Sequence, residues 1–479
     1  MKIAIVHYHL RSGGVTRVIE LACRALSQSG LQIAVLAGDI PAKSKIPNIV
    51  PTACLPKLDY EGASYREGKD LQRDLEKAAC HLLGGTPDIW HIHNHSLGKN
   101  LALPAVVAAW AESGAAMLLQ IHDFAENQRP KNYLNLVNAY GENLNCCLYP
   151  CTPRIGYALL NCRDERILKT IGFPGKIFYI PNPVLPLATS RDPILLPLPE
   201  IESLVVYPCR AIRRKNIGEA LLLTCGFHKG KHLAIALPPH SSEDLALYEH
   251  WKVLAANCRL PIQFEVCSQQ DILLGDLIAR ADCVVTTSME EGFGMTFLEA
   301  WVANKPLIGR DLPAITRDFR VQGLILDSFY DFLGIPISCI GKATVENSLL
   351  NRWEKIFAPL GITLDRRSRD KLFDRAVRGD RVDFGQLEPD LQTSLIRRAS
   401  QSLFAAEEII PKLPPIPGPK SVEINKQVVE TKYSLAEYRL QLLQTYQGLL
   451  LERSYPITYG DSRAIFRAYI LAFSGSISV

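Results

Sequence analysis

The sequence predicts an α/β protein built from two doubly wound domains, each with a parallel sheet covered by helices. Short apolar runs alternate with amphipathic helical stretches through most of the 479 residues. These runs are apolar throughout, as in strands that are buried on both faces of a parallel sheet. The alternation stops in a proline-rich stretch after residue 185 and then starts again, so a second α/β domain follows the first.

The first domain is expected over residues 1–185. An apolar strand at residues 3–8 leads into an amphipathic helix at residues 16–29, as in a βαβ unit. Further strands of the same kind are expected at residues 32–36, 89–93 and 117–122. Prolines recur over residues 186–199, which predicts a stiff linker there.

The second domain is expected over residues 200–410. It begins with a strand at residues 204–207 and a helix at residues 217–225, and more strands are predicted at residues 232–237, 262–266 and 283–286. After about residue 327 the strand signal fades. From about residue 320 we therefore expect a helical extension, with helices at residues 344–357, 365–377 and 387–409. A second linker is predicted at residues 411–420, followed by a helix at residues 434–452.

Charge and hydropathy exclude several classes of protein. Lys and Arg total 53 and Asp and Glu total 49, and a net charge of +4 argues against a nucleic-acid binder. The longest apolar stretch, residues 101–121, contains Pro104 and Glu112 and is better explained by a helix, a turn and a strand than by a membrane span. The chain starts directly with a strand pattern and shows no signal-peptide cleavage region, so we expect a cytoplasmic protein.

Metal-binding patterns are weak. The 13 cysteines are scattered and include no C-x-x-C pair, so they are expected to be core or loop thiols. His91, His93 and His95 share one strand face, but no carboxylate lies among them. We therefore expect no metal site.

The stretch from Glu291 to Glu299 is the most informative part of the sequence. It joins a strand to a helix expected at residues 295–302, and it contains Gly292, Phe293, Gly294 and Met295. Glycines let a ligand approach the backbone and N–H groups at a helix start bind anions, so phosphate is the expected ligand. Two carboxylates around such a turn accept hydrogen bonds from sugar hydroxyls, which predicts a phosphorylated sugar. The alternative is an ordinary turn followed by a surface glutamate.

Arg210 and Lys215 place positive charge after the strand at residues 204–207. At the carboxyl end of a parallel strand they would clamp a diphosphate and stabilise a leaving group. The alternative is a solvated basic loop, an interpretation that we prefer for Arg213 and Arg214.

Two candidate segments lie in the first domain. Gly13 and Gly14 follow the first strand and open a helix, where they could accept a phosphate or a sugar. His122 lies at the carboxyl end of a strand, either in a ligand cleft or as a structural histidine. No G-x-G-x-x-G follows any strand, which argues against an NAD-dependent enzyme.

Together these segments resemble the retaining glycosyltransferases of the GT-B fold, in particular family 4 (group 1). The resemblance covers residues 1 to about 310 and the helix from Ser434. It is carried by the E-x7-E motif of Glu291 and Glu299, Arg210, Lys215-Asn216, Gly13-Gly14, Ile180-Pro181-Asn182 and His122-Asp123.

The resemblance implies two Rossmann-like domains around a central cleft, with the acceptor on the first and the donor on the second. Residues 434–479 would cross back and complete the first domain. Glu299 would bind the ribose and Glu291 the transferred sugar, with help from backbone N–H groups around Phe293 and Gly294.

The same resemblance assigns the remaining candidates. Arg210 and Lys215 would neutralise the diphosphate, and His122 would touch the donor sugar near the reacting carbon. Gly13 and Gly14 would let the first domain approach donor and acceptor. Members of this group usually need no metal or other cofactor, and the chain carries no D-x-D triplet of the metal-dependent type.

The chain also departs from the family pattern. Cys209 replaces a common glycine, and residues 304–306 and 309–313 replace a common G-x-P and a small-residue turn. Residues from about 320 to 420 have no clear match. These changes leave the donor base and donor sugar open.

The expected function is retaining transfer of a hexosyl group from a nucleotide-diphosphate sugar to a hydroxyl acceptor. The acceptor stays open among a small molecule, a glycan and a lipid-linked group, and the last would bring peripheral contact with a membrane. Two alternatives remain because fold alone does not determine the reaction. They are an epimerase or phosphorylase on the same fold, and a non-catalytic nucleotide-sugar-binding protein.

Overall fold

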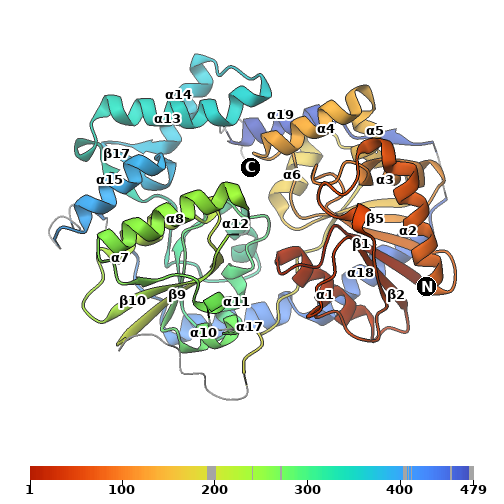
Figure 1. The fold of residues 1–479 in the computed structure, drawn as a ribbon, viewed down its shortest axis with the longest axis horizontal. Helices are drawn as coiled ribbons and strands as arrows, with labels where there is room; N and C mark the ends of the chain where they lie inside the picture. Colours follow the sequence, from red (N-terminus) through yellow and green to blue (C-terminus); the bar gives the residue numbers. More distant parts are fainter. Residues whose placement is uncertain are drawn as a thin grey trace. The chain divides into compact units, whose positions relative to one another are not determined.

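The chain folds into two compact units. The computed structural model describes residues 1–190, 201–239, 241–269, 272–402, 407, 409–410, 413–453 and 456–473. Unit 1 contains Met1–Pro183, Pro359–Ile362 and Tyr433–Val479, and unit 2 contains Val184–Ala358 and Thr363–Lys432. Each unit has its own parallel sheet with helices packed around it (Figure 1), so the predicted α/β class is confirmed.

Unit 1 is built on a seven-stranded parallel sheet in the order β3-β2-β1-β4-β5-β7-β8. The order reverses between β1 and β4, and doubly wound sheets bind ligands at the carboxyl ends of strands beside such a reversal. The strands are β1 (Lys2–His7), β2 (Gln32–Ala37), β3 (Thr52–Cys54), β4 (Ile89–His93), β5 (Met117–Ile121), β7 (Ile155–Leu159) and β8 (Lys176–Tyr179). A separate ribbon pairs β6 (Pro150–Cys151) with β18 (Thr458–Tyr459).

Helices cover both faces of this sheet. They are α1 (Gly14–Leu26), α2 (Gly68–Leu83), α3 (Leu103–Glu112), α4 (Pro130–Tyr140), α5 (Leu144–Leu148), α6 (Cys162–Thr170), α18 (Leu435–Leu450) and α19 (Ser462–Phe473). The late helix α18 packs against α1, and its Tyr438, Leu442 and Tyr446 are buried in the core shared with β1. Burial of this apolar face, rather than sequence proximity, holds α18 in unit 1.

Unit 2 repeats the plan with a six-stranded sheet in the order β11-β10-β9-β12-β13-β14. Its order reverses between β9 and β12, so the residues that follow these two strands lie beside the reversal. The strands are β9 (Ser203–Arg210), β10 (Lys231–Leu237), β11 (Ile262–Gln263), β12 (Cys283–Thr286), β13 (Leu307–Arg310) and β14 (Phe329–Tyr330). The helices are α7 (Ile217–Thr224), α8 (Ser242–Asn257), α9 (Val266–Gln269), α10 (Leu274–Arg280), α11 (Thr296–Val302), α12 (Pro313–Val321) and α17 (Pro419–Lys432).

The rest of unit 2 forms a small subdomain beside the main sheet. An antiparallel sheet in the order β15-β17-β16 joins β15 (Gly334–Pro336), β16 (Val377–Arg378) and β17 (Arg381–Asp383). Its helices are α13 (Lys342–Phe357), α14 (Arg366–Ala376) and α15 (Pro389–Ala399). Figure 1 shows these helices with β17 on one side of the β9–β10 region, next to α7 and α8.

The structure corrects several local predictions. The extension predicted to be helical also contains β14 to β17, which are two or three residues long and too short to show an alternating pattern. The helix predicted at residues 387–409 ends at Ala399, and the strand predicted at residues 262–266 ends at Gln263. The strands β3, β7, β8 and β13 were missed.

Some predicted segments lie outside the described residues. They are residues 191–199 of the first linker, residues 403–406 and 408 of the predicted helix, residues 411–412 of the second linker and residues 474–479 of the C-terminal segment.

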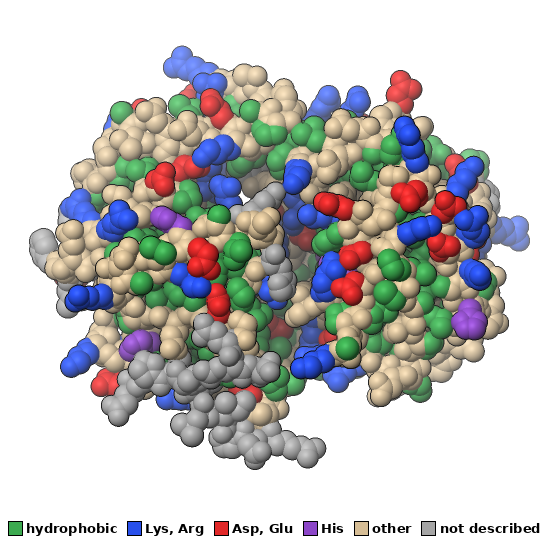
Figure 2. Space-filling model, viewed as in Figure 1, with side chains coloured by type: hydrophobic (Ala, Val, Ile, Leu, Met, Phe, Trp, Pro, Cys, Tyr) green, Lys and Arg blue, Asp and Glu red, His purple; other side chains and the backbone are tan. Residues whose placement is uncertain are grey.

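Two surface properties bear on partners. On the face drawn in Figure 2, Lys and Arg side chains are intermixed with Asp and Glu side chains, in keeping with the net charge of +4. Among the residues that the structure describes, no helix has the length and apolar character needed to cross a membrane.

Replacing Gly309 with Ala is expected to destabilise unit 2. Gly309 pairs with Thr286 across β12 and β13, its φ is +138°, and an added Cβ would lie 1.9 Å from the Thr286 carbonyl oxygen. We expect a loss of about 3 kcal/mol or more in the free energy of unfolding, measured with urea. Gly226→Ala is the control, because its nearest neighbours lie at 3.7 Å. Equal stabilities of the two variants would contradict the prediction.

Candidate functional site

The loop after β9 carries the predicted basic residues of unit 2. A 3-10 turn, Arg213–Lys215, ends at Asn216, whose φ of 50° and ψ of 55° are left-handed. Asn tolerates this conformation better than most residues, and here it turns the chain directly into α7. Lys215 is therefore held at the start of a helix and at the carboxyl end of the central strand.

Hydroxyl groups fix the backbone of this loop. The Lys215 carbonyl oxygen accepts hydrogen bonds from the Tyr207 hydroxyl at 2.9 Å and from Thr287 Oγ1 at 3.0 Å. Thr287 Oγ1 also donates to the Asn216 carbonyl oxygen at 3.1 Å. Tyr207 lies on β9 and Thr287 directly follows β12, so the two strands beside the reversal hold the loop between them.

Lys215 and Glu291 form an ion pair. Lys215 Nζ donates to Glu291 Oε1, and the exposed fractions of the two side chains are only 12% and 7%. Burial would raise the pKa of Glu291, but Lys215 and Arg214 outweigh it and lower that pKa below its ordinary value. The structure thus brings together a predicted diphosphate-binding cation and the first carboxylate of the E-x7-E motif.

The glycine loop between the two motif carboxylates is tightly built. Gly294 has a φ of +82°, and an added Cβ would lie 2.8 Å from the Phe297 ring, so the position needs glycine. Phe293 is buried and packs edge-on against Phe319 at 5.8 Å between ring centroids. Gly292 directly precedes Phe293 and is partly buried.

The helix after this loop starts one residue later than predicted. Met295 is the N-cap of α11, and the N–H groups of Phe297 and Leu298 already donate to the carbonyl oxygens of Gly294 and Met295. Glu299 lies in the first turn of α11 and is partly buried.

The guanidinium of Arg210 is hydrogen-bonded to the backbone at the end of β10. Its Nη1 donates to the Pro238 carbonyl oxygen at 2.8 Å, at the end of the neighbouring strand β10, and burial lowers its pKa. The structure therefore places Arg210 at the predicted edge of the sheet, with its guanidinium held towards β10.

The first-unit glycines lie in open surroundings. Gly13 is the N-cap of α1, and a Cβ on it would meet only the Arg11 carbonyl oxygen, at 3.8 Å. A Cβ on Gly14 would meet nothing within 4 Å. Neighbouring atoms of the chain therefore leave room for a side chain at both positions.

His122 is a buried neutral imidazole. Its Nε2 lies 2.8 Å from His93 Nδ1, so one nitrogen donates and the other accepts, and the rings stack at 5.1 Å. Its backbone N–H donates to Asn94 Oδ1 at 2.7 Å. Burial lowers the pKa of His122 to about 4, against a smaller opposing effect of Asp123.

The alternating histidines of β4 have protein partners. His91 Nε2 lies 2.9 Å from Gln120 Oε1, its Nδ1 lies 2.7 Å from the Tyr446 hydroxyl, and His95 Nε2 lies 2.8 Å from the Leu148 carbonyl oxygen. In the described part of the chain, no group of three or more His, Cys, Asp or Glu residues could hold a metal ion. The contact between His93 and His122 was missed, although the parallel pairing of β4 and β5 places their carboxyl ends together.

The fold and part of the sequence match known proteins. Residues 209–320 match the family described as "Glycosyl transferases group 1". Mannosylglucosyl-3-phosphoglycerate synthase of Petrotoga mobilis is 26% identical over 437 residues, which cover 85% of this chain and 82% of that protein.

Two solved structures confirm the predicted GT-B fold. Sucrose-phosphate synthase from Thermosynechococcus elongatus is 15% identical, with a TM-score of 0.55 over 94% of this chain and 99% of that chain. Anabaena HepE, in complex with UDP and glucose, is 12% identical, with a TM-score of 0.54 over 93% of this chain and 99% of that chain.

The buried histidines of unit 1 are expected to make stability depend on pH. The pKa of His122 and of His95 falls from 6.5 to about 4, because burial disfavours the charged form. Below pH 6.5 the unfolded chain therefore binds more protons than the folded chain, and stability falls as pH falls towards 4. At pH 5 each histidine would remove at most about 2 kcal/mol from the free energy of unfolding.

Urea unfolding between pH 7.5 and pH 5 measures this dependence. His95→Gln removes one such imidazole away from the candidate site. The free energy of unfolding of this variant should therefore depend less steeply on pH, by an amount that corresponds to about one bound proton. An unchanged slope in the variant would count against a neutral, buried His95.

Proposed function

We propose that this chain, which is a glycosyltransferase of group 1 with the GT-B fold, transfers a hexosyl group from a nucleoside diphosphate sugar with retention of configuration. The observation that carries the proposal is the buried ion pair of Lys215 and Glu291. It combines, at the carboxyl end of the unit 2 sheet, a cation for phosphate and a carboxylate for sugar hydroxyls.

The donor would be held by residues of unit 2. Lys215 would share its charge between Glu291 and the diphosphate, and Arg210 would add a second cation at the same edge of the sheet. Glu291 would accept hydrogen bonds from the transferred sugar, and Glu299 from the ribose. The complexes of HepE with UDP and glucose, and of Arabidopsis starch synthase IV with ADP and acarbose, support a nucleotide donor.

The glycines would allow the donor to lie close to the backbone. Gly292, Gly294 and the backbone at Phe293 and Met295 would lie against the sugar and phosphates, with their N–H groups as donors. In unit 1, the open surroundings of Gly13 and Gly14 support a role in accepting donor or acceptor.

The reaction is governed by charge. When the bond between the sugar C1 and the phosphate oxygen breaks, the sugar gains oxocarbenium character and the diphosphate gains negative charge. The acceptor oxygen attacks C1 on the same face, and its proton passes to the departing phosphate oxygen. Lys215 and Arg210 would stabilise that diphosphate, so no side-chain nucleophile is needed.

The neutral state of His122 suits this charge distribution. With a pKa of about 4, its imidazole carries no charge at neutral pH and would not repel a positively charged sugar. We propose that it forms a hydrogen bond with a hydroxyl of the donor sugar near C1. Its hydrogen bond with His93 would hold the ring in one orientation.

We also propose a chemical class for the acceptor and a cellular compartment for the protein. The name of the Petrotoga relative points to a phosphorylated sugar acid as acceptor, and such an acceptor is a small anionic molecule. All 13 cysteines are free, which supports a reducing compartment such as the cytoplasm.

Donor affinity should depend on Glu299. UDP-, GDP- and ADP-sugars would be screened by thermal shift, since a donor at one hundred times its Kd stabilises the folded state by about 2.7 kcal/mol. Glu299→Ala should abolish the shift given by the best donor. Glu249→Ala, on the exposed face of α8, should leave it unchanged. Full affinity in Glu299→Ala would refute the donor site.

Retention should be visible in the product. With the donor found by the screen and a phosphoglycerate glycoside as acceptor, proton NMR of the first product should show the anomeric configuration of the donor. Neutral monosaccharides serve as comparison acceptors. An inverted product would contradict same-face attack, and faster transfer to the neutral sugars would contradict the anionic acceptor.

A further inference from the structure

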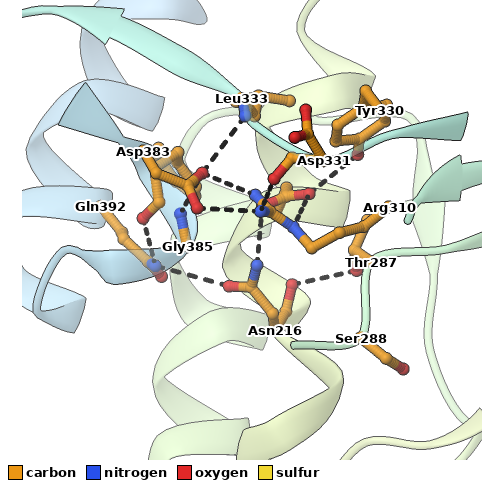
Figure 3. Close-up of polar contacts among 12 residues, drawn as sticks. Asn216, Thr287, Ser288, Arg310, Tyr330, Asp331, Leu333, Asp383, Gly385 and Gln392 are labelled. Atoms are coloured by element: carbon orange, nitrogen blue, oxygen red, sulfur yellow. Dashed lines mark hydrogen bonds and ion pairs between the residues drawn. The ribbon is translucent and has the colours of Figure 1, made fainter. Parts of the chain in front are cut away.

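Arg310, at the end of β13, forms a fully enclosed ion-pair cluster in unit 2 (Figure 3). Its Nε lies 3.1 Å from Glu219 Oε1 and its Nη2 contacts Glu219 Oε2. On the other side, Nη1 and Nη2 lie 2.9 Å and 2.8 Å from the two carboxylate oxygens of Asp383. Arg310 is only 2% exposed, so both carboxylates are joined through one buried guanidinium.

The cluster depends on the shape of arginine. A guanidinium offers two forks of parallel N–H groups, one for each carboxylate, which a lysine cannot supply. Burial would lower the pKa of Arg310, but Glu219 and Asp383 raise it well above its ordinary value, so it stays charged. Truncating one member would leave buried charge without compensation.

The two carboxylates belong to different parts of unit 2. Glu219 lies in the first turn of α7, just after Asn216, while Asp383 ends β17 in the small subdomain. We call residues 329–402, which contain β14 to β17 and α13 to α15, the 329–402 segment. Arg310 thus joins this segment to the helix that begins at the candidate site.

Asn216 links Glu219 to the loop that contains Lys215. Asn216 Nδ2 donates to Glu219 Oε2 at 2.7 Å, the same oxygen that Arg310 Nη2 contacts. Gln392 Nε2, on α15 of the 329–402 segment, lies 3.4 Å from Asn216 Oδ1. Figure 3 shows Asn216 between Gln392 on one side and Thr287 on the other.

A second contact reaches the loop that carries Glu291. A Cβ on Gly385 would lie 2.4 Å from Met289 Sδ and 3.1 Å from Arg310 Nη2, so this glycine backbone is packed between the two. Met289 N in turn donates to the Arg214 carbonyl oxygen at 2.9 Å. The 329–402 segment therefore supports both loops that supply the Lys215–Glu291 pair.

We propose that Arg310 and Asn216 are positioning residues, through which the 329–402 segment holds Lys215 in place to bind the donor diphosphate. This rests on the proposed function, because it takes Lys215 as the diphosphate ligand. It also assigns a role to a part of the chain that the family resemblance does not cover. The order of contacts is Asp383, Arg310, Glu219, Asn216 and Lys215.

The test uses Asn216→Gly in the full chain. Glycine adopts the left-handed conformation at residue 216 without strain, so the backbone can stay in place while the bond to Glu219 is lost. Affinities for UDP, GDP and ADP and for the matching nucleosides would be measured by calorimetry. For the diphosphate that wild type binds best, we expect Kd to rise about tenfold, with little change for the nucleoside.

Tyr330→Phe is the matched control. The Tyr330 hydroxyl donates to Glu219 Oε1 at 2.8 Å, so this variant removes a bond to the same carboxylate without touching Asn216. We expect a lower melting temperature and an unchanged diphosphate Kd. A double-mutant cycle completes the test. In a Lys215→Met background, Asn216→Gly should no longer change the diphosphate Kd, because the residue being positioned is absent.

Three results would overturn the inference. The first is an unchanged diphosphate Kd in Asn216→Gly, and the second is an equal loss of diphosphate and nucleoside affinity, which would indicate general damage to the site. The third is an undiminished effect of Asn216→Gly in the Lys215→Met background. If wild type bound none of the three diphosphates, the proposed function would fail first, and the inference with it.

Discussion

The arrangement of unit 2 around the candidate site depends on the buried ion pairs that the Arg310 guanidinium forms with Glu219 and Asp383. A cation removed from water needs opposite charge and complete hydrogen bonding, and here Glu219 and Asp383 supply both. Because each carboxylate belongs to a different substructure, satisfying one charge fixes the small subdomain against α7. The first turn of α7 also carries Glu219 next to Asn216, so this electrostatic requirement reaches the loop of Lys215.

The buried ionisable groups at the candidate sites of the two units are held in opposite states. In unit 2 these groups are charged and paired, Lys215 with Glu291 and Arg310 with its two carboxylates. In unit 1, burial keeps His93 and His122 neutral, and the two rings share one hydrogen bond. These states fit the proposed chemistry, because a departing diphosphate is stabilised by cations while a positively charged sugar is better placed beside uncharged groups.

The predictions from sequence succeeded where a local pattern had a single structural meaning. Long apolar strands such as Met117–Ile121 showed their type directly, and the strand, loop and helix around Glu291 followed from glycines and an apolar run. The strands β14 to β17 were missed because two or three residues carry no periodicity. Asp383 and Gln392 had no signal at all, since their partners Arg310 and Asn216 lie more than seventy residues away.

The sequence by itself determined the α/β class, the order of the two sheets along the chain, and the residue types available at the carboxyl ends of β9 and β12. Strand periodicity and local turn chemistry are enough for these, because they depend on near neighbours. Only the tertiary structure decided that Lys215 meets Glu291, that His93 meets His122, and that Arg310 joins the 329–402 segment to α7. Such pairs depend on strand order and burial, and burial determines which charged groups must find one another.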